Sequence, residues 1–361
     1  GVFSTTSGTS WGPKISELPN DATYGGNTDN EYTQKFGKQQ GKYYVPQRAA
    51  AGLDPWATPQ AYDNAKDFFD TGITWSNSLN VAQMLDKSSY SISLGNTHQD
   101  GIISSTGMDR YNVKVSADTK LTNNWSSGFT ANYITTSIDK AVTSGNGLLR
   151  TVYAAPPSYD LAGIPSHVDG NPYTQNSFRG SFDNAYWAME NNKFTEDTNR
   201  FFGNVYASYQ TDFGTTNHKL NAKYMVGVDA YTTHYVDSYG YGSNTGGGRG
   251  QIENYGWTNA TYNSLLTINY DWRINEDWGL NAVLGNEIIQ SNRKKYYEYG
   301  TNYNFPGWNH INNATTQQTE EETWKNRTVG FFGNVSASYK NMLYLTLTGR
   351  QDYVSNMPRN N

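Results

Sequence analysis

The chain has 361 residues and a formal net charge of −5, so it lacks the basic excess on which nucleic-acid binding depends. Charged residues make up only 16% of it, while aromatic residues reach 15%, and this aromatic content excludes a disordered chain. No run of 18 or more apolar residues is present, which excludes a membrane-spanning helix. The 35 Gly residues and the absence of Cys favour a protein built from many strands and loops.

Residues 1–72 are rich in Gly, Pro, Asn and Asp and show no sustained period, so we expect a long loop region there. The chain opens without a Met, a basic segment or an apolar segment, and we expect no signal peptide and two ends that lie inside a longer protein. A short helix is expected near 148–154, and the following Pro156 and Pro157 end it. Alternating segments begin near residue 73, and ten of them are predicted to be strands: 73–85, 89–98, 108–117, 124–137, 197–210, 218–234, 251–272, 277–297, 321–339 and 342–353.

The connections between these strands alternate strictly between short and long. The short ones are 86–88, 118–123, 211–217, 273–276 and 340–341. The long ones are 99–107, 138–196, 235–250 and 298–320. An up-and-down antiparallel meander has turns at one rim and loops at the other, and outer-membrane barrels place short turns in the periplasm and long loops outside. The sequence therefore predicts an all-β, antiparallel, up-and-down transmembrane β-barrel.

The two faces of the predicted strands differ in polarity. In 343–350, one face carries Leu343, Leu345 and Leu347, and the other carries polar side chains that include Arg350. The same segregation occurs in 111–118, 129–134, 219–231 and 279–287, and no charge lies on the apolar face of these five stretches. A Lys or Arg facing lipid would cost about 2–4 kcal/mol at mid-membrane, so lipid would enforce this pattern. A half-buried sheet of a soluble protein also alternates, and it remains the alternative.

Aromatic residues gather near the short turns, and this favours the membrane barrel over the soluble sheet. Rings at one common height form an interfacial girdle in membrane proteins. The residues concerned are Tyr90, Trp125, Tyr209, Tyr270, Trp272, Trp278, Tyr339 and Tyr344. The string from Arg200 to Tyr209 recurs in similar form from Gly330 to Tyr339, which we interpret as two strands in equivalent surroundings.

Several residue strings occur in order along the chain and are specific when taken together. They are Trp11–Lys14 (WGPK), Tyr62–Gly72 (YDNAKDFFDTG), Tyr90–Tyr111 (YSISLGNTHQDGIISSTGMDRY), Asn184–Trp187 (NAYW) with Asn199 and Arg200, and Tyr344–Asp352 (YLTLTGRQD). These strings resemble the SusC/RagA family of TonB-dependent outer-membrane transporters, although Ala185 stands where the family usually has Pro.

The resemblance implies a barrel of about 22 strands filled by an N-terminal plug, of which about ten strands are present here. Residues 1–72 would be an extracellular loop region after the plug, and residues 73–361 part of the barrel. The implied function is uptake of oligosaccharides or peptides across the outer membrane of Gram-negative, Bacteroidetes-type bacteria. The implied partners are outer-membrane lipid, a SusD-like surface lipoprotein that acts as a lid, and the TonB–ExbB–ExbD system, reached through a TonB box outside this sequence.

Candidate site residues fall into two groups. Trp187, Trp257 and Trp308 lie in or near predicted extracellular connections, where an exposed ring can stack on a sugar, although packing within a loop is the more ordinary role. The charged residues expected to face the interior, for contact with the plug or a ligand, are Lys114, Lys219, Lys223, Asp229, Glu287 and Arg350.

No enzymatic role is predicted. The five His residues are scattered without the spacing of a zinc site, and no nucleophile elbow is present, so we expect no catalytic residues, no metal and no cofactor. The alternative function is a soluble carbohydrate-binding or glycan-degrading β-protein, which the aromatic and Asn-rich composition also suits.

Overall fold

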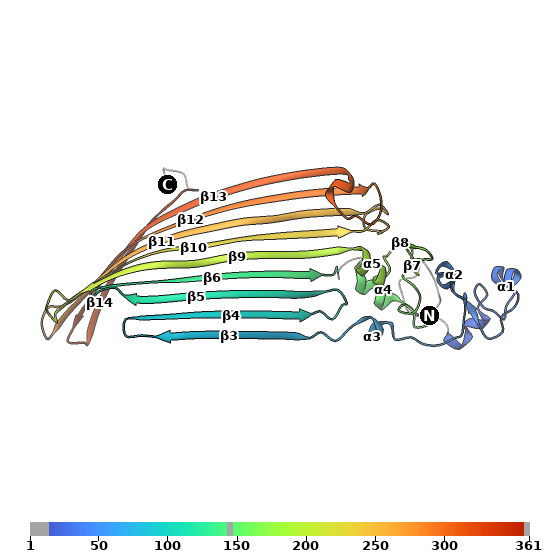
Figure 1. The fold of residues 1–361 in the computed structure, drawn as a ribbon, viewed down its shortest axis with the longest axis horizontal. Helices are drawn as coiled ribbons and strands as arrows, with labels where there is room; N and C mark the ends of the chain where they lie inside the picture. Colours follow the sequence, from blue (N-terminus) through green and yellow to red (C-terminus); the bar gives the residue numbers. More distant parts are fainter. Residues whose placement is uncertain (1–13, 143–146, 357–361) are drawn as a thin grey trace.

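A ten-stranded antiparallel sheet dominates the computed structural model, which describes residues 14–142 and 147–356 (Figure 1). All ten predicted strands are confirmed, and each pairs with the next in chain order, so the sheet is a meander. The sheet is not closed: β3 and β14 form its two edges. The strands are β3 (Thr74–Met84), β4 (Ser88–Asp100), β5 (Gly107–Lys120), β6 (Trp125–Lys140), β9 (Lys193–Thr211), β10 (His218–Tyr239), β11 (Gln251–Arg273), β12 (Trp278–Tyr303), β13 (Ala314–Tyr339) and β14 (Leu343–Val354).

Several strands extend further toward the long loops than the sequence predicts. The largest difference is at β13, which begins at Ala314 rather than at residue 321. The stretch from Ala314 to Glu320 has no apolar alternation, yet its backbone pairs with β12 in unbroken register from Thr316. Backbone hydrogen bonds to β12 extend the sheet there, and the polarity pattern does not record them.

Short turns lie at one rim of the sheet and long connections at the other, as the alternating lengths predict (Figure 1). Two of the turns share one mechanism. The amide of Trp125 donates to Oγ1 of Thr122 over 3.0 Å, and the amide of Trp278 donates to Oδ1 of Asn275 over 2.8 Å. These short polar side chains hold the turn so that the following Trp enters its strand at the rim.

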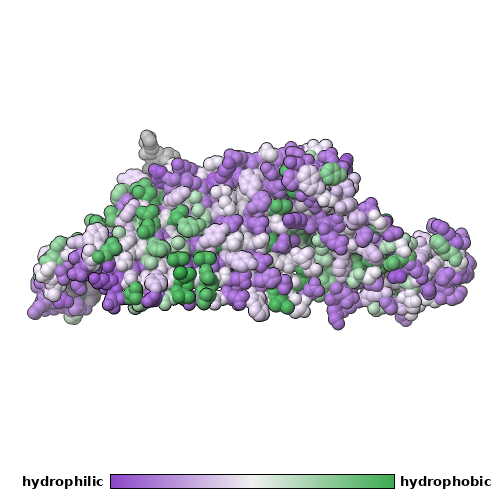
Figure 2. All heavy atoms as spheres, in the orientation of Figure 1, coloured by the Kyte–Doolittle hydropathy of each residue, from purple (hydrophilic) through white to green (hydrophobic). Residues whose placement is uncertain are grey.

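The strand register places all the predicted apolar stretches on one face of the sheet. Val113 pairs with Tyr133, Tyr133 with Phe201, and Phe201 with Ala230, and equivalent rows continue to β14. On this face, the five side chains nearest the short turns of every described strand include no Asp, Glu, Lys or Arg. We call this region the apolar band. Figure 2 shows apolar residues gathered over the turn half of the molecule, whereas hydrophilic residues dominate the loop end.

Aromatic pairs line the turn-side border of the apolar band. Trp125 and Tyr209 face each other across β6 and β9 with ring centroids 5.1 Å apart, and Trp278 and Tyr339 do so across β12 and β13 at 4.8 Å. The recurring strings in β9 and β13 therefore occupy equivalent places, each with its Tyr beside a Trp. Tyr344 does not belong to this girdle, because its register places it on the opposite face.

Short helices and strands form a separate body at the loop rim. It combines two stretches, 14–72 and 147–192, that are far apart in the sequence (Figure 1). The predicted helix near 148–154 is α4. The elements are η1 (Ile15–Asn20), α1 (Glu31–Phe36), β1 (Tyr43–Tyr44), α2 (Pro46–Ala50), β2 (Trp56–Ala57), α3 (Asn64–Phe68), α4 (Leu148–Ala154), β7 (His167–Val168), β8 (Asn171–Gln175) and α5 (Ala185–Asn191), while η2 (Ile311–Asn313) lies in the last long loop.

One apolar core holds the two stretches together. Leu18, Tyr43 and Phe68 from the first pack in the same cluster as Val152 and Leu161 from the second. The core of residues 14–72 is thus completed by the connection between β6 and β9. Within the described residues, none of the helices combines the length and apolarity needed to cross a membrane. The residues Trp11, Gly12 and Pro13 of the WGPK string lie outside the described part of the chain.

Candidate ligand-binding site

The face opposite the apolar band is polar at the height of the band, and the register places all six predicted interior-facing residues on it. We call it the polar face. Three of the six form ion pairs within the sheet. Arg200 donates to Asp229 through Nε over 2.8 Å and through NH2 over 2.6 Å. Arg350 donates to Glu287 over 2.8 Å and also contacts Asp352. These charges at mid-height of the sheet therefore compensate one another.

The remaining three predicted charges are lysines. The ammonium of Lys223 lies 4.2 Å from the centre of the Tyr206 ring, a cation–π contact. In the part of the chain that the structure describes, Lys114 and Lys219 form no ion pair. Their role as contacts for a plug or ligand stays a prediction.

Toward the loop rim, the polar face becomes aromatic. One row across three strands consists of Tyr235, Tyr255 and Tyr297, which are direct neighbours in the register. The rings of Tyr235 and Tyr255 are stacked at 4.8 Å with an angle of 7°, and Trp257 meets both edge-on. We call the five residues Tyr235, Tyr255, Tyr297, Trp257 and Trp324 of β13 the aromatic cluster.

An arginine lies between the two tryptophans of this cluster. The guanidinium of Arg293 is 5.3 Å from the Trp257 ring and 5.4 Å from the Trp324 ring. Arg293 is exposed, and among the described residues it forms no ion pair. The indole Nε1 of Trp257 is buried and has no hydrogen-bond partner among the described residues. The contacts hold the guanidinium in place while its charge remains uncompensated.

Two carboxylates face each other beside the tyrosine row. Asp237 and Glu253 are directly opposite in the pairing of β10 with β11. Like charges at such a position destabilise a sheet unless a donor or cation compensates them. The hydroxyl of Tyr255 donates to Asp237 over 3.0 Å. The nearby ammonium of Lys140 is instead 3.4 Å from Glu196 and lies over the ring of Tyr235. Neither Asp237 nor Glu253 forms an ion pair in the described part of the structure.

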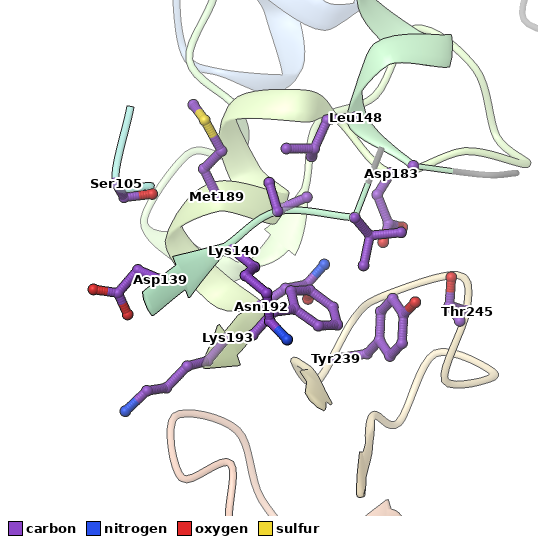
Figure 3. Close-up of a pocket in the computed structure, with 15 residues that line it drawn as sticks. Ser105, Asp139, Lys140, Leu148, Asp183, Met189, Asn192, Lys193, Tyr239 and Thr245 are labelled. Atoms are coloured by element: carbon purple, nitrogen blue, oxygen red, sulfur yellow. The ribbon is translucent and has the colours of Figure 1, made fainter. Parts of the chain in front are cut away.

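Two adjoining cavities open at this end of the polar face. Asp237 and Glu253 line one of about 350 Å³, together with Lys140, Phe194 and Tyr239. The last three also line the second cavity, of about 300 Å³, which reaches under the body at the loop rim. In Figure 3, Leu148 and Met189 lie on one side of the second cavity, and Tyr239 and Thr245 lie on another. Cavities of this size fall at the lower end of the range for small-ligand sites.

A buried carboxylate shapes the second cavity. Asp183 accepts hydrogen bonds from Ser243 Oγ over 2.6 Å, from the amide of Asn244 over 2.8 Å and from Gln175 Nε2 over 2.8 Å. These neutral donors join the connection between β6 and β9 to the loop between β10 and β11. Asp183 therefore has a structural role that its own position in the sequence does not indicate.

The three tryptophans predicted as stacking residues differ in their surroundings. Trp187 is fully buried in the core of the loop-rim body, and its Nε1 donates to the carbonyl of Pro172 over 2.9 Å. Its ring is not accessible to a ligand in this conformation, which corrects the expectation drawn from its place in a long connection. Trp308 is exposed and stacks on His310 with centroids 4.9 Å apart. Of the three, only Trp257 belongs to the aromatic cluster.

Sequence reasoning missed most of this site. Tyr235, Tyr255, Tyr297, Arg293 and Trp324 come from four strands and are brought together only by the register. Within the described residues no group of three or more His, Asp or Glu side chains is arranged to hold a metal ion.

Comparison with known proteins gives a partial likeness. No protein-family model matches the chain. The chain is 23% identical over 319 residues to TonB-dependent receptor P3 of Formosa agariphila, which covers 84% of this chain and 30% of that protein. The fold is similar to that of the RagAB peptide importer in its closed-closed state, with a TM-score of 0.67 and 17% identity over 84% of this chain and 34% of that one. Another structure of the RagAB peptide transporter gives a TM-score of 0.66 with 16% identity and the same coverage.

These relatives are a receptor and transporters rather than enzymes. The chain spans about a third of their length. The resemblance inferred from the residue strings is thereby confirmed: over the part that it spans, this chain is similar to a SusC/RagA-like TonB-dependent transporter.

Proposed function

We propose that this chain forms part of the wall of an outer-membrane transporter that imports oligosaccharides or peptides in a Gram-negative, Bacteroidetes-type bacterium. The observation that carries the proposal is the apolar band. Leu284, Leu345 and Leu347 on it are 62%, 65% and 67% exposed. A soluble protein rarely leaves a continuous apolar face of ten strands uncovered, whereas lipid covers such a face in a membrane barrel.

The dimensions of the band support the same proposal. Five side chains on one face correspond to ten residues, at about 3.3 Å each along a strand. At a tilt of about 40°, ten residues rise by about 25 Å, the height of the apolar belt of outer-membrane barrels. The ring pairs Trp125–Tyr209 and Trp278–Tyr339 lie at the turn-side border, where a headgroup region would begin.

The remaining parts of the transporter are inferred from the likeness. The open edges of β3 and β14 present backbone groups that need further strands in a membrane, which supports a barrel larger than ten strands. The family resemblance implies about 22 strands. A plug would lie against the polar face, and the TonB–ExbB–ExbD system would act on it. The loop-rim body, which includes residues 14–72, would face outward toward a SusD-like lipoprotein lid.

Fractionation of the native cells tests this function. A transporter wall stays with the outer membrane after a carbonate wash at high pH, and its electrophoretic mobility changes on heating as a barrel unfolds. A soluble carbohydrate-binding or glycan-degrading protein, the alternative function, is released by the wash. Release of this chain in a folded, soluble form would end the transporter proposal.

A further inference from the structure

The loop half of the polar face carries charges of both signs, at two separate places, that form no ion pair among the described residues. Asp237 and Glu253 lie at one end, in the cavity of about 350 Å³, and Arg293 lies at the other, between Trp257 and Trp324. At mid-height, by contrast, Arg200 and Arg350 have carboxylate partners. This difference between the loop half and mid-height bears on binding. Covering an unpaired charge with a ligand or plug costs free energy unless the ligand supplies an opposite charge.

The register fixes the separation of the two ends. Glu253 pairs with Tyr299 of β12, which is six residues from Arg293 on the same strand. Six residues of a strand extend about 20 Å. An extended peptide of about six residues has the same length, and its two termini carry charges of opposite sign. Between the ends lie the rings of the aromatic cluster, among which Trp324 is 44% exposed.

We propose that this region binds a short peptide with free termini. Its amino terminus lies between Asp237 and Glu253, its carboxylate is held by Arg293, and its side chains pack on the aromatic cluster. A neutral oligosaccharide leaves both charged ends without partners, whereas a peptide supplies both. This assignment rests on the proposed function and narrows its ligand from oligosaccharide or peptide to peptide.

Chemical blocking of each terminus, combined with a matched substitution, tests the two ends separately. The native full-length protein is purified in detergent, and its Trp fluorescence is titrated with a mixture of hexapeptides with free termini. The same mixture is then used N-acetylated or C-amidated, beside maltohexaose and xylohexaose. Each blocked terminus should weaken binding about tenfold, since a charge-assisted hydrogen bond is lost.

The substitutions locate each effect. In the double variant D237N/E253Q, acetylation should have almost no further effect, while amidation still weakens binding. In R293Q the pattern should reverse. Asp271→Asn and Arg273→Gln, on the polar face near the turns, are the controls and should leave both effects intact. Heat-dependent electrophoretic mobility shows whether each variant is folded.

Three outcomes overturn the assignment. They are tighter binding of the hexaoses than of the peptides, equal effects of blocking in wild type and variants, and no binding of any of these probes. Each can occur in a protein that remains in carbonate-washed outer membranes, so failure of the peptide site is distinguishable from failure of the transporter proposal.

Discussion

The apolar band leads to a specific prediction at Leu284, for which the preceding residue, Val283, serves as the control. Leu284 lies on the band, four side chains from the short-turn end of β12, between Ile268 and Gly333. Val283 is on the polar face of the same strand. Leu284→Lys and Val283→Lys introduce the same charge at the same height, and only the face differs. A soluble sheet whose apolar face is buried would give the same order of destabilisation for the two variants. The comparison is therefore made in a lipid bilayer.

The magnitude follows from lipid contact. A Lys at the middle of a bilayer costs about 2–4 kcal/mol, whereas the same Lys facing a wet interior costs under about 1 kcal/mol. A difference of about 3 kcal/mol changes the folding equilibrium by more than a hundredfold. The native protein is refolded into lipid vesicles across a urea series, and the folded fraction is read from its heat-dependent mobility.

The depth series decides between lipid and protein burial. Leu345→Lys, nearer the turn rim, should cost less than Leu284→Lys, because the penalty falls toward the membrane interface. Equal costs for Leu284→Lys and Val283→Lys in vesicles, or a larger cost for Val283→Lys, would refute lipid contact on this face.

Four further substitutions test other parts of the structure, two by the same urea titration and two by limited proteolysis. Trp125→Ala should lower the free energy of unfolding by about 1–3 kcal/mol through the lost contact with its partner at the rim and with the interface; no change would remove the girdle interpretation. Trp187→Ala should cost about 3–5 kcal/mol locally, seen as faster proteolysis within 147–192, while Trp308→Ala should not; the reverse ranking would contradict the burial of Trp187. Gly285→Val should destabilise β12 by about 1–3 kcal/mol, because the ring of Phe332 occupies the space of the added carbon atoms; unchanged stability would show that this ring can move aside.

The strands were predictable because their evidence is local. A period of two is visible within ten residues, and it survives in β14, where Leu343, Leu345 and Leu347 alternate with polar side chains. The same signal is absent from Ala314 to Glu320, and the sequence therefore places the start of β13 too late. The topology could also be predicted from the order of the strands, since strands that follow one another in the sequence are neighbours in the meander.

The site was less predictable because its evidence is non-local. Tyr235 and Tyr297 are more than sixty residues apart, and only an exact register of β10, β11 and β12 shows that they share a row. For Trp187 the prediction of an exposed ring was wrong. A position in a long connection suggests exposure, but Trp187 belongs to a core whose other members, such as Phe68 and Val152, come from segments whose association no local pattern reveals.

The distribution of charge along the polar face indicates different roles for its two halves, stability in the turn half and binding in the loop half. Where Arg200 meets Asp229 and Arg350 meets Glu287, each charge is compensated within the sheet, so this part of the wall needs no outside partner to remain stable. At the loop rim, Arg293 is held by aromatic rings and forms no ion pair with any carboxylate in the described part of the chain. Such a charge contributes little to folding and is free to bind. Substitutions in the turn half should therefore change stability in lipid, and those in the loop half should change what the wall binds.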